Sequence, residues 1–202
     1  MISFRRLRSA VALLASLLAV VVATASPAQA YPRDWGYLYN QASAWCADLP
    51  DTGPVYNTYV YEHECVRDWL KDNQLWGFQA VPDVLPRNRD GSVSQAFVIR
   101  NGKSQQCMDL PGTGWVAKGT QVWMHDCVPN TGDNQLWYWD RSPSDHYYEL
   151  RHLATGWCLD VDGWGGQQNG QPLTLYTCSK DETWPPGASE DDDHLWSVLG
   201  PQ

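Results

Sequence analysis

The sequence has few basic residues and no motif of a known catalytic site. Its 202 residues include 14 lysines and arginines against 23 aspartates and glutamates, which gives a formal net charge of −9. Because nucleic acids and anionic membrane surfaces attract an excess of positive charge, we expect the chain to bind neither. It has no nucleophile elbow, H-E-x-x-H run or phosphate-binding loop, and no two acidic residues stand out as a glycosidase pair. We therefore expect no enzymatic activity.

Long apolar runs are lacking after the N-terminus. Residues Val11–Val22 are all apolar or small, follow a basic start and precede an A-x-A run at Ala28–Ala30. This pattern is typical of a secretory signal peptide, and the run is short for a membrane span. We expect residues 1–30 to be the signal peptide, with Tyr31 as the first mature residue and Ser26 as the alternative. The predicted product is extracellular and is not inserted in a membrane.

The chain has an even number of cysteines, and no two of the six lie within four residues of each other. A structural zinc site needs ligands two to four residues apart, so we expect no bound metal and no other cofactor. In a secreted chain, an even set of cysteines indicates disulfide bonds. Composition alone leaves the pairing open, because six cysteines can pair in many ways.

A short run that ends in tryptophan recurs three times. It is DNQLW at Asp72–Trp76, DNQLW again at Asp133–Trp137, and DDHLW at Asp192–Trp196. Two cysteines at nearly constant separation precede each run. Such self-similarity indicates one structural unit used three times. It selects one disulfide per repeat among the alternatives, namely Cys46–Cys65, Cys107–Cys127 and Cys158–Cys178.

Helical periodicity is nearly absent. Short segments alternate apolar and polar residues, as in Gln121–His125 and Pro172–Tyr176, and turn residues such as Asn169-Gly170 separate them. Short strands with closely spaced turn signals predict an all-β barrel or sandwich. Three copies that each supply several strands favour a threefold barrel, the β-trefoil.

We expect residues 31–202 to form a single domain. Residues 81–94 are a polar, proline-containing connector, and the third repeat carries an insertion, Lys180–Asp193, rich in proline, glycine and acidic residues. This composition predicts a surface loop. The repeats run approximately over residues 37–79, 97–140 and 147–199.

The order of motifs resembles the ricin-B-type lectin family, which includes carbohydrate-binding modules of secreted bacterial glycosidases. Each repeat has C-x-D, then a strand that ends at the second cysteine, then N-Q-x-W or a variant of it. The resemblance covers essentially the whole chain after residue 30. It implies a β-trefoil of twelve strands, four per repeat. It also implies that Trp76, Trp137 and Trp196 are core residues, as a large aromatic repeated symmetrically suggests in any case.

The resemblance further implies a shallow sugar site in each repeat. An aspartate accepts hydrogen bonds from two neighbouring hydroxyls, an aromatic ring lies against the apolar face of the pyranose, and an asparagine binds a further hydroxyl. Matched residue by residue, the aspartates are Asp48, Asp109 and Asp160, the ring positions hold His63, His125 and Tyr176, and the asparagine positions hold Asn73, Asn134 and Asp193. A further contact position holds Tyr61, Trp123 and Thr174.

The three repeats depart from the family pattern in different ways. The first two place histidine at the ring position, where imidazole is a smaller platform and titrates near pH 6.5. The third replaces Asn-Gln with Asp193-His194, so this corner accepts hydrogen bonds but an aspartate cannot donate them. Asp160 and Asp193 would then lie close together. We expect Gln74 and Gln135 to bind backbone within their repeats.

The sequence thus favours a monomeric carbohydrate-binding protein whose partners are glycans or polysaccharides. One alternative is a protein-binding trefoil, such as a secreted protease inhibitor, that uses the Lys180–Asp193 loop. Another is a structural protein whose sugar sites have been lost. In any single repeat the aspartate has a simpler explanation as a turn cap. The agreement of aspartate, ring and amide at matching offsets supports the first hypothesis.

Overall fold

Every regular element that the structure describes is a β-strand. The computed structural model describes residues 35–68, 70–141, 148–163, 169–179 and 193–200. The predicted signal peptide and nearly all of the Lys180–Asp193 insertion lie outside these ranges. Within them, the chain has no helix of the length and apolarity that a membrane crossing requires.

Twelve strands follow the predicted repeats, four to each repeat. The first repeat contains β1 (Trp35–Asn40), β2 (Cys46–Asp48), β3 (Tyr61–His63) and β4 (Leu75–Ala80). The second contains β5 (Phe97–Asn101), β6 (Cys107–Asp109), β7 (Trp123–His125) and β8 (Trp137–Arg141). The third contains β9 (Tyr148–His152), β10 (Cys158–Val161), β11 (Gln171–Tyr176) and β12 (Leu195–Leu199).

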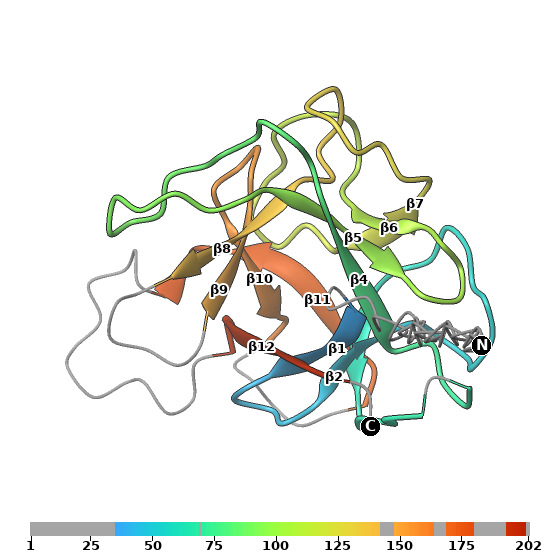
Figure 1. The fold of residues 1–202 in the computed structure, drawn as a ribbon. Helices are drawn as coiled ribbons and strands as arrows, with labels where there is room; N and C mark the ends of the chain where they lie inside the picture. The colour runs from blue at the N-terminus through green and yellow to red at the C-terminus, as the bar shows by residue number, and fades with distance from the viewer. Residues whose placement is uncertain (1–34, 69, 142–147, 164–168, 180–192, 201–202) are drawn as a thin grey trace, which may run out of the picture. The chain divides into compact units, whose positions relative to one another are not determined.

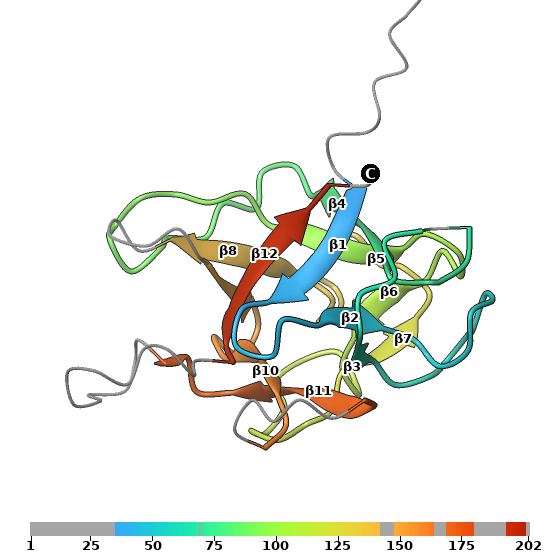
Figure 2. The same ribbon diagram turned by 90° about the horizontal axis from the view of Figure 1, so that it is seen from below.

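Six of these strands form a closed ring of antiparallel pairs. In order, β1 pairs with β4, β4 with β5, β5 with β8, β8 with β9, β9 with β12, and β12 returns to β1. Figures 1 and 2 show β1 beside β12, where the first and last strands meet. The remaining strands form three hairpins, β2–β3, β6–β7 and β10–β11. This arrangement is a β-trefoil, which confirms the fold class predicted from the sequence.

The core is built from equivalent residues of the three repeats. Trp76, Trp137 and Trp196 are fully buried and belong to one apolar cluster with Met108 and Met124. The indole Nε1 of Trp76 donates to the carbonyl of Ala47 at 2.9 Å. A buried Trp that also satisfies its N–H both fills volume and fixes the orientation of its strand. Trp196 makes the equivalent bond to the Leu159 carbonyl at 3.0 Å, so these two tryptophans tie barrel strands to the hairpins that carry the predicted sites, whereas Trp137 contributes by packing alone among the residues that the structure describes.

One disulfide fastens each hairpin, with the pairing that the repeat selected. The bonds are Cys46–Cys65, Cys107–Cys127 and Cys158–Cys178, and the described residues include no free cysteine. The first cysteine opens the first strand of its hairpin, and the second lies two residues after the end of the second strand. Each disulfide therefore closes the hairpin that bears the predicted aspartate and ring.

The last residue of each repeat's first strand contacts the preceding repeat of the ring. His152 Nε2 lies 2.6 Å from the Asn134 carbonyl, which can only accept, so Nε2 carries the proton and Nδ1 accepts from Thr155 Oγ1 at 2.8 Å. In each repeat this last residue donates a hydrogen bond to the backbone carbonyl of a predicted site residue in the preceding repeat. Every repeat therefore helps to hold the site of its neighbour. The three bonds run from Asn40 Nδ2 to the Asp193 carbonyl at 2.6 Å, from Asn101 Nδ2 to that of Asn73 at 2.5 Å, and from His152 Nε2 to that of Asn134 at 2.6 Å.

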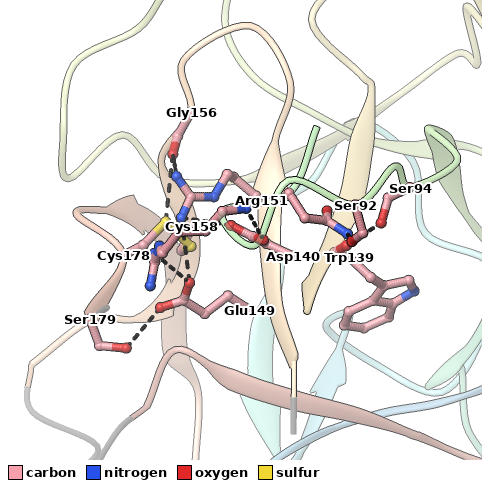
Figure 3. Close-up of polar contacts among 12 residues, drawn as sticks. Ser92, Ser94, Trp139, Asp140, Glu149, Arg151, Gly156, Cys158, Cys178 and Ser179 are labelled. Carbon is pink, nitrogen blue, oxygen red and sulfur yellow. Dashed lines mark hydrogen bonds and ion pairs between the residues drawn. A yellow bond between two sulfur atoms is a disulfide. The ribbon is translucent and has the colours of Figure 1, made fainter. Parts of the chain in front are cut away.

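A largely buried ionic network fixes the 81–94 connector to the β8–β9 hairpin (Figure 3). Arg89 and Arg151 both contact Glu149 Oε2, at 3.2 and 3.5 Å. Arg151 also pairs with Asp140 Oδ2 at 3.0 Å. Loss of one partner would leave a buried charge uncompensated. The connector that the sequence marks only as polar is therefore anchored to the second and third repeats.

Candidate functional site

The predicted aspartate of each repeat lies on the outer face of its hairpin. Successive residues of a strand point to opposite faces, so the residue between aspartate and cysteine faces the core. The opposite strand then brings the ring position and the further contact position to the same outer face. The cross-strand pairs are Asp48 with Tyr61 and Cys46 with His63, Asp109 with Trp123 and Cys107 with His125, and Asp160 with Thr174 and Cys158 with Tyr176.

In the first repeat, protein groups bond to both the Asp48 carboxylate and the Asn73 amide. Asp48 Oδ1 accepts from the Leu49 N–H at 2.7 Å, and Oδ2 accepts from Gln74 Nε2 at 3.1 Å. Burial raises the pKa of Asp48 to about 6, although the Gln74 bond lowers it in part. Asn73 Oδ1 accepts from the Leu49 N–H at 3.3 Å. Its Nδ2 donates to the carbonyls of Pro50, Asp51 and Gly53, so Asn73 holds the hairpin loop.

In the second repeat, the aspartate lies beside an exposed histidine ring, and a side-chain hydrogen bond from Gln135 lowers the pKa of the aspartate in part. Asp109 Oδ1 accepts from its neighbouring backbone N–H at 2.7 Å, and Oδ2 lies 3.8 Å from Nδ1 of the exposed His125. Burial raises the pKa of Asp109. The ring of Trp123 is stacked with His125, with centroids 5.9 Å apart at 17°. Asn134 Nδ2 donates to the Gly114 carbonyl at 3.0 Å, whereas its buried Oδ1 has no hydrogen-bond partner among the residues that the structure describes.

In the third repeat, a histidine lies between two carboxylates. His194 Nε2 is 3.4 Å from Asp160 Oδ1, and its Nδ1 is 3.2 Å from Asp193 Oδ1. Thr174 Oγ1 also donates to Asp160 Oδ2 at 3.0 Å. Burial raises the pKa of Asp160 to about 7; His194 opposes this shift and Asp193 adds to it. The ligand atoms of Asp160, Asp193 and His194 lie within 4.8 Å of one another, as a metal site would require.

The ring of the third repeat already has a cation beside it. Tyr176 is 46% exposed, but Lys118 Nζ from the second repeat lies 5.2 Å from its ring centroid and 4.9 Å from that of Trp157. Such contacts between an ammonium and an aromatic face are attractive. A sugar that stacked on the same face of Tyr176 would have to displace Lys118, so this platform is less accessible than its exposure suggests.

The backbone role expected for the site glutamines is present in both repeats. Gln74 Oε1 accepts from the Val66 N–H at 2.7 Å, and Gln135 Oε1 accepts from the Val128 N–H at 2.8 Å. Gln135 Nε2 also donates to the Asp126 carbonyl at 2.9 Å. The bond from Gln74 to Asp48 was not expected, and Gln135 makes the equivalent side-chain hydrogen bond to Asp109.

A buried carboxyl of the first repeat was missed by the sequence analysis. Glu62 points inward between Tyr61 and His63, and its Oε2 accepts from Ser43 Oγ at 2.6 Å. Burial raises the pKa of Glu62 to about 7. The signal was available, because the residue three before the second cysteine is Met124 in the second repeat and Leu175 in the third, which marks a core position.

The three disulfide-closed hairpins on a threefold barrel agree with the family that the chain matches by sequence. Residues 72–176 match the model of the ricin-type beta-trefoil lectin domain-like family. The chain belongs to this family. No curated protein matches this ricin-type trefoil by sequence.

Solved structures share the fold of this ricin-type trefoil at low sequence identity. The designed threefold-symmetric protein ThreeFoil is 16% identical, with a TM-score of 0.59 over 82% of this chain and 97% of that chain. A ricin B-like lectin of Macrolepiota procera in complex with lactose is 18% identical, with a TM-score of 0.57 over 83% and 95%. A Polyporus squamosus lectin bound to a sialylated trisaccharide is 14% identical, with a TM-score of 0.56 over 83% and 49%. These likenesses establish the trefoil fold.

Proposed function

We propose that this ricin-type trefoil is an extracellular carbohydrate-binding protein, exported through its N-terminal signal sequence, whose principal sugar site is on the second repeat. The observation that carries the proposal is the grouping of Asp109, Trp123 and His125 on one outer face. Membership of a lectin-like family supports carbohydrate binding in general. The geometry of the second repeat supports this choice among the three.

Each member of this group suits a different part of a pyranose. The Asp109 carboxylate accepts from two donors, and charge-assisted hydrogen bonds are stronger than neutral ones. Trp123 and His125 offer flat faces to the apolar side of a sugar ring. A neutral sugar with adjacent free hydroxyls matches this set.

The choice of first ligands follows from the relatives. The Macrolepiota procera lectin was solved with lactose, and the Polyporus squamosus lectin with a trisaccharide that contains galactose. Galactosides are therefore the first sugars to test, and xylan is the second because xylose also presents adjacent hydroxyl pairs. A single shallow site of this kind gives a Kd near millimolar, about −4 kcal/mol. Repeated sites on a polysaccharide strengthen retention by avidity.

Retention on immobilised sugars tests the proposal. The mature, oxidised protein should bind galactoside beads or insoluble xylan and be released by the free sugar. The variant Asp109→Asn keeps the shape of the side chain and an acceptor for the backbone, but it removes the charge, so it should lose most of this retention. Asp83→Asn is the matched control, because Asp83 is exposed in the connector and its φ of 64° suits asparagine.

Two results would contradict the proposal. A folded sample that no sugar retains would refute carbohydrate binding. Retention that Asp109→Asn leaves unchanged would move the principal site away from the second repeat. Circular dichroism and thermal unfolding of both variants separate a lost site from a lost fold.

A further inference from the structure

A strand segment of the first repeat extends the outer face of the second. The Val60 N–H donates to the Val122 carbonyl at 2.9 Å, and the Met124 N–H donates to the Thr58 carbonyl at 2.8 Å. Between these bonds, Tyr59 is the antiparallel partner of Trp123. Because directly opposed residues share a face, Tyr59 joins Trp123 and Asp109 in a row across three adjacent strands.

Three rings follow one another on this face, namely Tyr59, the half-buried Trp123 and the exposed His125. Tyr59 is 45% exposed. Its ring centroid lies 6.4 Å from that of Trp123, which is in turn 5.9 Å from that of His125. These spacings are comparable to the length of one sugar unit in an extended chain. The Asp109 carboxylate lies at one end of the row, beside His125.

Side chains beside the row fix the two repeats to each other. Gln106 Nε2 donates to Asn57 Oδ1 at 3.1 Å and to Asp126 Oδ1 at 3.0 Å, and the Asn57 N–H donates to Gln106 Oε1 at 2.9 Å. The strand that carries Tyr59 is thus held against β7 before any ligand binds. A rigid platform loses little conformational entropy on binding. Exposed Asn57 and Asp126 also give the row a polar border suited to hydroxyl groups.

The equivalent rows of the other repeats lack the second ring. In the first repeat, Pro172 lies opposite Tyr61. In the third, Gln121 lies opposite Thr174, which is buried and bonded to Asp160. Among the described residues, two aromatic rings lie side by side across this inter-repeat contact in the second repeat alone. The pairing of Tyr59 with Trp123 is therefore a feature of the second repeat and not a consequence of the threefold symmetry.

We propose that Tyr59 and Trp123 form a second sugar subsite next to the Asp109 site, so that the second repeat binds a linear chain of at least two pyranose units. The first unit bonds to Asp109 and lies against His125, and the next stacks on Trp123 and Tyr59. The preferred ligand is then an oligosaccharide or polysaccharide segment rather than a terminal monosaccharide. This inference rests on the proposed carbohydrate-binding function.

Calorimetric titration with sugars of increasing length tests the subsite. The full mature protein is titrated with galactose and xylose and with the β-1,4-linked disaccharide to tetrasaccharide of each. The parent should bind the longer members about 3- to 10-fold more tightly than the monosaccharide, the range expected for one aromatic contact. Tyr59→Ala should lose this gain and keep the monosaccharide affinity. Tyr59→Phe should retain the gain, because it retains the ring.

The matched control is Gln121→Ala, which truncates the equivalent position of the third repeat and should leave the length dependence unchanged. If Tyr59→Ala fails to fold, Tyr59→Gln supplies the residue that the third repeat carries there. If the protein binds the monosaccharide but its affinity does not increase with oligosaccharide length, the subsite is overturned and the proposed function stands. If Tyr59→Ala keeps the full increase in affinity with length, the subsite is overturned as well. No binding of any length would refute the proposed function together with the subsite.

Discussion

Asn73 of the first repeat and Asn134 of the second stand in the same five-residue run, DNQLW, but they have different hydrogen bonds. Asn73 bonds to three loop carbonyls and one backbone N–H. Asn134 bonds to one carbonyl, and its Oδ1 has no partner among the described residues. The difference comes from the connection between the hairpin strands β2 and β3, because the turn at Pro50–Gly53 brings several carbonyls to Asn73. Equal motifs therefore share a core role, while these connections decide how many hydrogen bonds the asparagine makes.

The largest expected effect is the loss of stability when the core tryptophan, which the first two repeats share, is removed. Trp76→Ala and Trp137→Ala should each lower the free energy of unfolding by about 3–5 kcal/mol, because both remove a fully buried indole from one core. Urea unfolding with the disulfides intact measures both values. A variant of either kind that is as stable as the parent would show that the two tryptophans are not equivalent.

The next prediction replaces a core residue of the first repeat with its equivalent from the second. Burial raises the pKa of Glu62 to about 7 from an ordinary value of 4.5. The protonated form therefore contributes stability that is present below pH 4.5 and lost as the pH rises through 7. Glu62→Met, which copies Met124, should raise the free energy of unfolding by about 2–3 kcal/mol at pH 8.

The pH dependence distinguishes this mechanism from better packing. The gain of Glu62→Met should shrink when the pH is lowered to 4.5, where the parent is already protonated. A gain of equal size at both pH values would instead reflect packing against the core. Thermal unfolding at the two pH values gives the comparison.

The third prediction replaces His152, which makes one of the three hydrogen bonds between repeats, with the asparagine that the other two repeats have there. Burial lowers the pKa of His152 to about 4 from an ordinary 6.5. Neutral His152 therefore contributes stability that is present above pH 6.5 and lost as the pH falls through 4. His152→Asn, which copies Asn40 and Asn101, should improve stability at pH 5 by about 2 kcal/mol relative to its effect at pH 8.

The difference between the two pH values is the informative quantity for His152→Asn. The imidazole also packs against Trp137, with centroids 5.1 Å apart, so the variant loses contacts at every pH. Guanidinium unfolding at pH 5 and pH 8 separates the two contributions. An effect independent of pH would mean that His152 does not resist protonation in the folded protein.

The smallest effect compares the sites themselves. Asp48→Asn should leave sugar affinity unchanged, because we propose that the principal sugar site is on the second repeat. Asp109→Asn should weaken affinity about tenfold, or about 1.4 kcal/mol. Titration of both variants with the best sugar measures the difference. Equal losses would remove the distinction between the first and second repeats.

The sequence predicted the elements that repeat and missed those that do not. The disulfides and the β-trefoil follow from spacing shared by three copies. Glu62 was missed because its apolar equivalents emerge only when the repeats are aligned on their second cysteine. His152 was missed because it replaces the asparagines of the other copies. The neighbours Tyr59 and Trp123 could not be predicted, because no motif specifies which strands of different repeats pair.

The bonds of Asn40, Asn101 and His152 make the order of the repeats along the chain a matter of convention. Each repeat is completed by the next, and the last is completed by the first through Asn40 and the β1–β12 pair. A circular permutant that begins at the second or third repeat would preserve all three of these bonds. Removal of any one repeat would break two of them and open the ring. The three units thus form an indivisible cycle, although the genetic message that specifies them is linear.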